Sequence, residues 1–192
     1  MTSPAGSEAK RILVVAATEP ELCGRPGLAC GVGPVEAASA TARALALDRP
    51  DAVLHVGLAG GGGLPAGSIV VGTEAVYADI SAAIPVLSRL APDPHLLSSV
   101  SGLLPDALAL PIVTSAAVGA LHGAGTEGAL VEAMEGFAVL RACELAGVPA
   151  VEIRVISNEI GESDRRRWHV DVALDALARV LPILSADLTS TI

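Results

Sequence analysis

Aromatic side chains are scarce in this chain of 192 residues, since Phe, Trp and Tyr together make up only 2% of it. Basic residues are also few, with 12 Lys and Arg against 21 Asp and Glu, so the formal net charge is −9. Nucleic-acid binding relies on basic patches and on rings that stack against bases, and this composition argues against it. Apolar residues still make up 52%, so the core must be built mainly from Ala, Val, Leu and Ile.

Cysteine is rare too, with only Cys23, Cys30 and Cys143 in the chain. They show no CxxC or Cys/His spacing of the kind that binds zinc. A disulfide framework is untypical of a chain of this size and composition. We therefore expect a reducing compartment, and no metal or other cofactor.

Long hydrophobic runs are absent as well. No apolar run reaches the ~18 residues that a membrane span needs. The run Ile12–Ala17, which follows Lys10-Arg11, is too short for the apolar part of a signal sequence. We expect a cytoplasmic protein with no membrane partner. Because charged residues make up only 17%, many apolar residues need covering, which favours a face for self-association.

What is present is an alternation of β-branched and helical segments. Residues 1–9 predict a disordered polar tail, and no linker divides residues 10–192, so we expect a single domain there. Continuous β-branched runs are typical of strands covered on both faces, and the pattern predicts strands at 12–17, 27–32, 52–56, 68–78, 111–118, 130–133 and 150–156. Helices are predicted at 35–47, 134–146 and 170–184. The fold class is α/β, a three-layer αβα arrangement with a twisted, mostly parallel or mixed central sheet.

Two glycine-rich segments and one proline-rich segment interrupt this pattern. Gly57–Gly63 is expected to be a loop, either a flexible turn or a wall where backbone approaches a ligand. It matches neither a P-loop nor a convincing GxGxxG. Residues 119–128 predict a second glycine-rich loop, in which His122 is more typical of a solvated histidine than of a catalytic one. Residues 79–110, broken by four prolines, are the least informative part.

Three polar residues follow predicted strands or open a predicted helix. Glu21 follows the first strand, Glu135 lies at the start of the helix 134–146, and Asn158 follows the strand 150–156. In open α/β sheets, ligands bind beyond the carboxyl ends of the strands. Glu135 and Asn158 therefore indicate one pocket for a sugar and a polar heterocycle, although Glu135 can also serve as a first-turn carboxylate. Glu21 is either a loop and helix-start residue or a catalytic base. Glu152 and Arg154, inside a strand, would be costly unless each has a partner.

Four short motifs in the right order resemble a known superfamily. They are ATEPE at 17–21, VGLAGG at 56–61, VEAMEGF at 131–137 and RVISN at 154–158. Together they resemble the purine nucleoside phosphorylase/nucleosidase superfamily, in the branch of the methylthioadenosine/S-adenosylhomocysteine nucleosidases. Within that branch, EAMEGF and ISNEIGESDRRRW resemble the futalosine hydrolases. The resemblance covers most of residues 11–185.

The resemblance implies a fold, an assembly and an activity. It implies a twisted sheet flanked by helices in a nucleosidase domain that forms homodimers or larger homo-oligomers. The activity that it implies is hydrolysis of the N-glycosidic bond of futalosine, with release of hypoxanthine, in menaquinone biosynthesis by the futalosine route. The substrate is then a small-molecule nucleoside, and no cofactor takes part.

The same resemblance assigns roles by position. Glu21 falls where the nucleosidases keep the carboxylate that activates water, and a carboxylate near the ribose also stabilises a cationic sugar. The other matching positions contact substrate in the family: the ribose at Met134 and Glu135, the base at Ser157 and Asn158, and the pocket wall at Ala59 and Gly60.

Asn158 separates the possible leaving bases. The adenine-specific nucleosidases of this superfamily have aspartate at this position. An asparagine amide can donate to O6 of a 6-oxopurine and accept from a protonated N7, which favours hypoxanthine over adenine. The alternative is an asparagine that merely caps the strand.

The arginine-rich loop after Asn158 is a candidate for the 5′ side of the substrate. Futalosine carries a benzoate-type carboxylate there, and guanidinium groups bind carboxylates in a bidentate manner. Arg165 and its two arginine neighbours could bind it, and Trp168 could stack on a ring or close the pocket. A solvated loop with Trp168 as a core anchor is the alternative. Phe137 fits ring contact and core packing equally well.

The sequence also allows other functions. A phosphorylase for inosine-like nucleosides would need basic groups at a phosphate site, for which Arg25 and Arg43 are candidates, but Glu21 would repel phosphate. A nucleosidase for methylthioadenosine or S-adenosylhomocysteine is a further alternative. A catalytically silent nucleoside-binding protein would fit if Glu21 faced solvent, remote from Glu135.

Overall fold

The computed structural model describes residues 10–117 and 130–191. The expected tail 1–9 and the glycine-rich loop 119–128 with His122 lie outside the described residues. The described chain forms eight strands, β1 (Ile12–Ala16), β2 (Leu28–Ala29), β3 (Ala52–Gly61), β4 (Ile69–Tyr77), β5 (Arg89–Leu90), β6 (Leu108–Thr114), β7 (Val131–Ala133) and β8 (Ala150–Asn158). Its α-helices are α1 (Pro34–Leu47), α2 (Pro94–Leu103), α3 (Gly136–Ala146) and α4 (Val170–Thr191), and two short 3-10 helices are η1 (Glu19–Leu22) and η2 (Arg165–Arg167).

All strands belong to one mixed sheet. β1 pairs in parallel with β2 and β3, and β3 pairs in parallel with β8. β4 runs antiparallel to β5 and β8 but parallel to β6, which is parallel to β7. β7 then runs antiparallel to the end of β3. The pairings β3–β8–β4–β6–β7–β3 therefore close on themselves, so part of the sheet curls into a small barrel.

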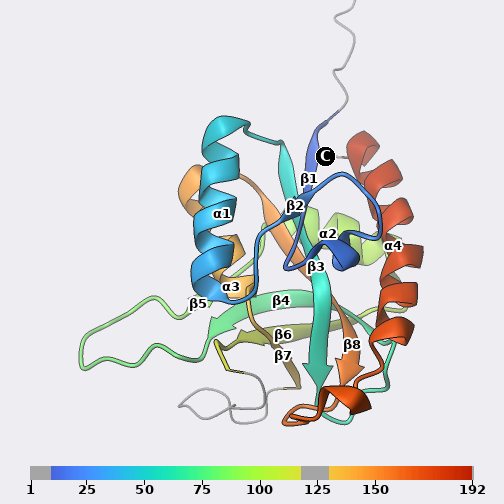
Figure 1. The fold of residues 1–192 in the computed structure, drawn as a ribbon. Helices are drawn as coiled ribbons and strands as arrows, with labels where there is room; N and C mark the ends of the chain where they lie inside the picture. The colour runs from blue at the N-terminus through green and yellow to red at the C-terminus, as the bar shows by residue number, and fades with distance from the viewer. Residues whose placement is uncertain (1–9, 118–129, 192) are drawn as a thin grey trace, which may run out of the picture.

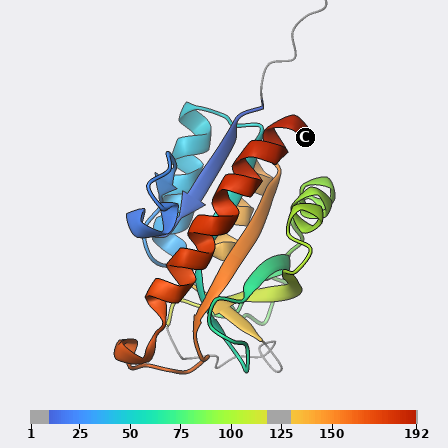
Figure 2. The ribbon, with the colours of Figure 1, turned by 90° about the vertical axis from the view of Figure 1, so that its right-hand side faces the viewer.

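Helices cover both faces of this sheet. In Figure 1, α1 and α3 lie on one side of the strands, and α2 and α4 lie on the other. Figure 2 shows α4 lying along the outside of β1 and β8. One core cluster joins Val14 and Leu54 to Leu177 of α4, and another joins Val53 to Leu45 of α1 and Val139 of α3. The expected three-layer αβα class with a mixed central sheet is confirmed.

The expectation of a loop over the first glycine run was wrong. β3 continues through Gly57 and Gly60 to Gly61 in extended conformation, and positive φ begins only at Gly63. A Cβ on Gly61 would lie 2.8 Å from Cγ2 of Ile156. These glycines therefore let side chains of β8 approach β3 closely.

The proline-rich region contains more structure than its sequence suggested. Asp93 accepts a hydrogen bond from the Leu96 amide at 2.8 Å and caps α2, which starts at Pro94. β6 starts at Leu108, before the predicted 111, and Pro111 pairs beside a register shift in β4. A proline in a strand is tolerated at such an irregularity. No helix in the described part of the chain is long and apolar enough to span a bilayer.

Candidate active site

Alternation along two adjacent strands places a set of polar residues on one face of the sheet. Side chains alternate between faces along a strand, and Val53 of β3 and Ala150 of β8 both belong to the core cluster with α1 and α3. His55, Glu152 and Arg154 therefore face the same helices. In the parallel register, His55 lies beside Glu152, and Gly57 lies beside Arg154.

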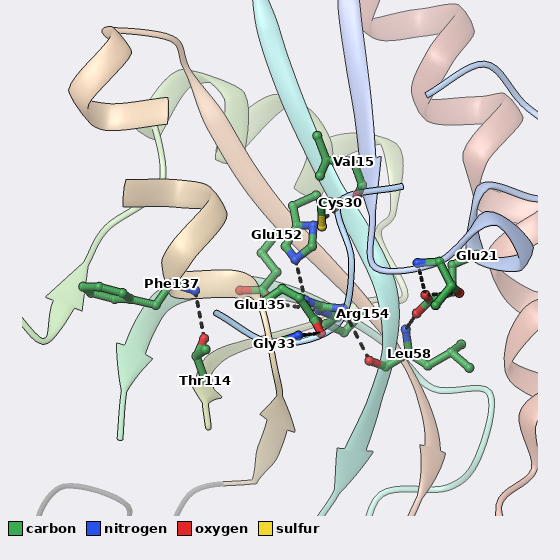
Figure 3. A network of polar contacts seen from close by, with 12 residues as sticks. Val15, Glu21, Cys30, Gly33, Leu58, Thr114, Glu135, Phe137, Glu152 and Arg154 are labelled. Atoms are coloured by element: carbon green, nitrogen blue, oxygen red, sulfur yellow. Dashed lines mark hydrogen bonds and ion pairs between the residues drawn. The ribbon is translucent and has the colours of Figure 1, made fainter. Parts of the chain in front are cut away.

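Arg154 is the centre of a buried polar network, and its side chain is 0% exposed. Its Nε donates to Oε1 of Glu152 at 2.7 Å. Its Nη2 donates to Nε2 of His55 at 2.5 Å and to Oε2 of Glu135 at 3.3 Å, and its Nη1 donates to the carbonyl of Leu58 at 3.4 Å. Figure 3 shows this guanidinium between the glutamates. Ion pairing of a buried charge is what makes its burial tolerable.

The pKa values of Arg154, Glu152 and His55 are shifted by burial and by their charged neighbours. Burial opposes the charge of Arg154, but Glu152 and Glu135 outweigh it and raise the pKa of the guanidinium. Burial raises the pKa of Glu152, although Arg154 partly opposes this. Burial and the charge of Arg154 hold the pKa of His55 well below its usual value. His55 is therefore neutral, and because its Nδ1 lies 3.1 Å from the Val15 carbonyl, which only accepts, Nδ1 carries the proton.

Glu135 occupies the N-cap position of α3, where the helix dipole favours an anion. Its Oε1 accepts a hydrogen bond from the amide of Gly33 at 3.1 Å, and Oε2 accepts from Arg154. The side chain is buried. The loop before α1 and the start of α3 therefore meet at this carboxylate.

Glu21 reaches the same region from the other side. It lies in η1, and its Oε2 accepts hydrogen bonds from the amide of Thr18 at 2.9 Å and from its hydroxyl at 2.6 Å. Oε1 accepts from the amide of Leu58 at 3.0 Å. Leu58 thus binds Glu21 through its N–H and Arg154 through its carbonyl. Glu21 is buried, not directed into solvent.

Because Gly57 has no side chain, the Glu21 carboxylate and the Arg154 guanidinium can both lie close to its backbone. A Cβ on Gly57 would lie 2.4 Å from Nη1 of Arg154 and 2.8 Å from Oε1 of Glu21. No side chain at this position is compatible with that approach. Figure 3 shows Glu21 and Glu135 on either side of Arg154, so two acids far apart in the sequence converge on one cation.

Ser157 and Asn158 form a second polar group at the end of β8. Ser157 is buried, and its hydroxyl donates to Oδ1 of Asn158 at 2.7 Å. Nδ2 of Asn158 donates to the carbonyl of Glu159 at 3.0 Å. Asn158 lies four residues beyond Arg154, about 13 Å along an extended strand. It faces a cavity of about 250 Å³ lined by Leu64, Ala66, Asn158, Glu159, Glu162, Arg167 and His169.

The arginine-rich loop lies at this end of the molecule. The Arg165 guanidinium sits over the ring of Trp168 at 5.4 Å, and the Trp168 indole donates to the carbonyl of Glu162 at 2.9 Å. Arg166 pairs with Asp164, while Arg167 pairs with Glu162 at 3.2 Å and lines the cavity beside Asn158.

The remaining sequence-predicted residues lie between these two groups or beside them. Ala59 is buried in β3, and a Cβ on Gly60 would lie 3.2 Å from Nδ2 of Asn158. Met134 is half-buried, between β7 and α3. Phe137 is buried and stacks on Tyr77 with ring centroids 5.2 Å apart.

Sequence reasoning did not recognise three members of the site. Glu152 and Arg154 were noted only as a cost to the strand, and His55 was not singled out. Their signal was the period of two, because polar residues at 152 and 154 on a buried strand must share a face. His55 could be added only with the register between β3 and β8, which the sequence does not specify.

Two of the free cysteines, Cys30 and Cys143, are buried. Burial raises the pKa of Cys30 to about 11 and that of Cys143 to about 12, so both are neutral thiols. Within residues 10–117 and 130–191, no cluster of three or more His, Cys, Asp or Glu side chains is arranged to hold a metal ion.

Residues 22–186 match the family model of the phosphorylase superfamily. An S-adenosylhomocysteine nucleosidase from Streptococcus pyogenes, solved with 5-methylthiotubericidin, has a similar fold, with a TM-score of 0.81, 21% identity, and 97% of this chain and 99% of that one covered. The chain therefore belongs to the phosphorylase superfamily.

Two curated relatives refine this placement. Futalosine hydrolase from Streptomyces coelicolor is 37% identical over 186 residues, 83% of this chain and 79% of that protein. A 5'-methylthioadenosine/S-adenosylhomocysteine nucleosidase from Chromohalobacter salexigens is 31% identical over 160 residues, 71% and 68% of the two chains. Within the superfamily, the chain belongs to the futalosine hydrolase family, as its motifs indicated.

Proposed function

We propose that this chain is a nucleosidase that hydrolyses the N-glycosidic bond of futalosine and releases hypoxanthine, a step of menaquinone biosynthesis by the futalosine route. The observation that carries the proposal is the convergence of two buried acids on Arg154: Glu135 binds its guanidinium, and Glu21 lies beside it at Gly57. The futalosine hydrolases of the same family support the choice of substrate.

The charge of this site suits cleavage of a glycosidic bond. As the bond breaks, the ribosyl carbon becomes cationic and the purine gains negative charge. Glu21, Glu135 and Glu152 surround one buried cation, Arg154, so the site has an excess of acidic groups. Preorganised negative charge in a buried site stabilises a cation that develops there. Arg154 and Glu21 are the groups closest to Gly57.

Glu21 and Arg154 together suit the nucleophilic water. Oε1 of Glu21 accepts one hydrogen bond from Leu58, and carboxylate oxygens have a second lone pair. A water that bridges the two groups can donate to this oxygen and accept from Nη1 of Arg154. Glu21 then serves as the general base, a role that contributes roughly 10²–10⁴-fold in enzymes.

Glu135 suits the ribose hydroxyls, and Asn158 suits the base. Each oxygen of Glu135 accepts one hydrogen bond from the protein and can accept another from a sugar hydroxyl. Asn158 lies at the carboxyl end of β8, four residues beyond Arg154 on the same strand. The Asn158 amide is hydrogen-bonded to Ser157 and Glu159, and the purine base replaces these partners when it binds. Ala59 and Gly60 form the wall between, and Met134 and Phe137 flank Glu135.

The loop residues are assigned to the 5′ side or to the pocket entrance. Trp168 and Arg165 form one stacked unit, which can present a ring and a cation to the benzoate-type group of the substrate. Because Arg166 is bound bidentately by Asp164 within the loop, it is the weaker candidate.

Phosphorolysis is the second candidate and is disfavoured by charge. Among the described residues that meet Glu21 and Glu135, Arg154 is the sole cation, and it already binds two carboxylates. Arg25 contacts Ser185, and Arg43 is exposed on α1. A phosphate beside Glu21 would meet an acid without a free cation. Cleavage of methylthioadenosine is the third candidate, supported by the Chromohalobacter relative and opposed by Asn158.

One assay separates these functions. The purified protein is incubated with futalosine, inosine or methylthioadenosine, each with and without phosphate, and the free base is measured by chromatography. We expect hypoxanthine from futalosine, at a rate that phosphate does not change. Release that requires phosphate would establish a phosphorylase, adenine from methylthioadenosine would establish the other nucleosidase, and no release from any substrate would indicate a binding protein.

A further inference from the structure

His55 is a buried, titratable residue to which hydrolysis as described above gives no role. It lies on β3 with a relative exposure of 0%. It contacts neither open space nor Glu21, and its ring spans from the carbonyl of Val15 on β1 to Arg154 on β8. Burying an imidazole is unfavourable unless both nitrogens have partners, and here both do.

We propose that His55 is a positioning residue that holds the guanidinium of Arg154, so that one Nη1 hydrogen faces Glu21. The proposal rests on the proposed function, because the faced position is that of the nucleophilic water. His55 acts through Arg154 and does not itself touch the substrate.

The hydrogen bonds of Arg154 show what His55 contributes. A guanidinium has five N–H donors in one plane. Nε is directed at Glu152, and Nη2 is shared by His55 and Glu135. Nη1 uses one hydrogen for the Leu58 carbonyl. Nη1 has a second hydrogen, and both Nη1 and Oε1 of Glu21 lie beside Gly57.

Without His55, the plane of the guanidinium is less well determined. The Glu135 contact at 3.3 Å is long for a charged pair, and Glu135 must also bind the ribose. The His55 contact at 2.5 Å is the shortest of the four. His55 therefore keeps Nη2 in place when Glu135 shifts toward a substrate hydroxyl.

A neutral acceptor is needed at this point. A carboxylate would add a further negative charge beside Glu152 and Glu135, and an apolar side chain would leave a buried N–H of a cation without a partner, which costs about 1–3 kcal/mol or more. The Val15 carbonyl fixes the tautomer of His55 with the proton on Nδ1, so that Nε2 is available to accept. The lowered pKa of His55 agrees with a neutral ring.

Two substitutions at His55 separate its two nitrogens. In His55→Asn the amide reaches the position of Nδ1 and can donate to Val15, but nothing accepts from Arg154. In His55→Gln the amide reaches the position of Nε2, and its oxygen can accept from Arg154. We expect kcat for hypoxanthine release from futalosine to fall roughly tenfold to a hundredfold in His55→Asn, because small misplacements of a positioned group have effects of this size.

In His55→Gln we expect most of that kcat to be restored, with KM close to the wild-type value in both variants. A merely structural histidine would give equal losses in the two variants, in step with their melting temperatures, and that result would overturn the proposal. Unchanged kcat in His55→Asn would overturn it as well, and so would a loss confined to KM.

A second measurement on the wild-type protein keeps this proposal separate from the function. Long-range ¹H–¹⁵N spectra of histidine-labelled protein, with His55→Gln to identify the signal, report the tautomer. A protonated Nδ1 and an unprotonated Nε2 are expected at neutral pH, whatever the substrate proves to be. A protonated Nε2 would refute the acceptor role. Failure to cleave futalosine, with the expected tautomer present, would instead refute the proposed function alone.

Discussion

At the scale of single residues, Glu21 is held in place by its own chain segment. Both of its carboxylate oxygens accept backbone hydrogen bonds, from Thr18 and from Leu58. Such contacts hold a carboxylate in one orientation before the substrate arrives, which is the preorganisation that catalysis requires. The exposed neighbour Glu19 lies in the same 3-10 helix and lacks this setting.

Glu21→Gln is expected to reduce futalosine hydrolysis at least about a hundredfold, because the amide cannot accept a proton from water. Substrate binding should change little, which isothermal titration with futalosine can measure. Glu19→Gln is the matched control and should retain wild-type turnover. Turnover retained in Glu21→Gln would show that the base is another group.

His55 also makes stability depend on pH. Its pKa lies well below 6.5 in the folded protein, so between the two pKa values the unfolded chain binds a proton that the folded chain excludes. The contribution to the free energy of unfolding is therefore full above about pH 6.5 and is lost as pH falls below it. The raised pKa of Glu152 acts in the opposite direction, because the folded state then binds the extra proton.

Comparison of wild type with His55→Gln isolates the histidine, because Glu152, Glu135 and Arg154 face the site in both proteins. From pH 7.5 to pH 5.5, the free energy of unfolding from urea titrations should fall by about 1 kcal/mol more in the wild type than in the variant. Parallel pH dependences would contradict a buried neutral His55.

At the scale of elements, the start of α3 sits directly on the carboxylate of Glu152. A Cβ on Gly136 would lie 2.1 Å and 2.3 Å from the two oxygens of Glu152. One of these oxygens, Oε2, has no hydrogen-bond partner among the described residues. The first turn of α3 thus approaches β8 more closely than any side chain at Gly136 permits, and the helix dipole favours the acids below it.

Gly136→Ala should therefore lower the free energy of unfolding, by about 1–3 kcal/mol as for other overpacked core sites, and should reduce turnover by displacing Glu135. Gly102→Ala in α2 is the control, because its Cβ would meet nothing within 4 Å. That change should be neutral or stabilising by about 0.5–1 kcal/mol. Urea unfolding measures both, and an equally stable Gly136→Ala protein would disprove the close approach.

At the scale of the whole molecule, apolar side chains are exposed on a segment that leaves the body. The connection between β4 and β5 extends outward in Figure 1. Ile84 on it is 70% exposed, and Ile80, Val86 and Leu87 are also exposed. Exposed apolar clusters of this kind are typical of protein–protein contacts. A homodimer or larger homo-oligomer that covers these side chains stays a prediction.

Sedimentation velocity should show a species of at least twice the 19.1 kDa mass of the chain. Ile84→Ser should shift this equilibrium toward the monomer, because it removes buried apolar area, whereas Ile84→Val should not. A monomer at micromolar concentration in the wild type would refute the expectation.

Outside residues 79–110, the order of strands and helices could be predicted because the periods of two and 3.6 are local properties of the sequence. Glu21, Glu135 and Asn158 could be singled out because each lies at a segment boundary and within a family motif. The path of β3 could not, since Gly57–Gly61 resembles a loop until β8 is packed against it.

By itself, the sequence determined the α/β class, the acidic and aromatic-poor composition, and the motifs that place the chain in its family. Only the tertiary structure decided that His55, Glu152 and Arg154 share one buried network, and that Glu21 and Glu135 converge there. The physical reason is that burial and charge pairing depend on the register between β3 and β8. Strand register is set by contacts between distant segments, and a one-residue shift would turn these side chains to the other face.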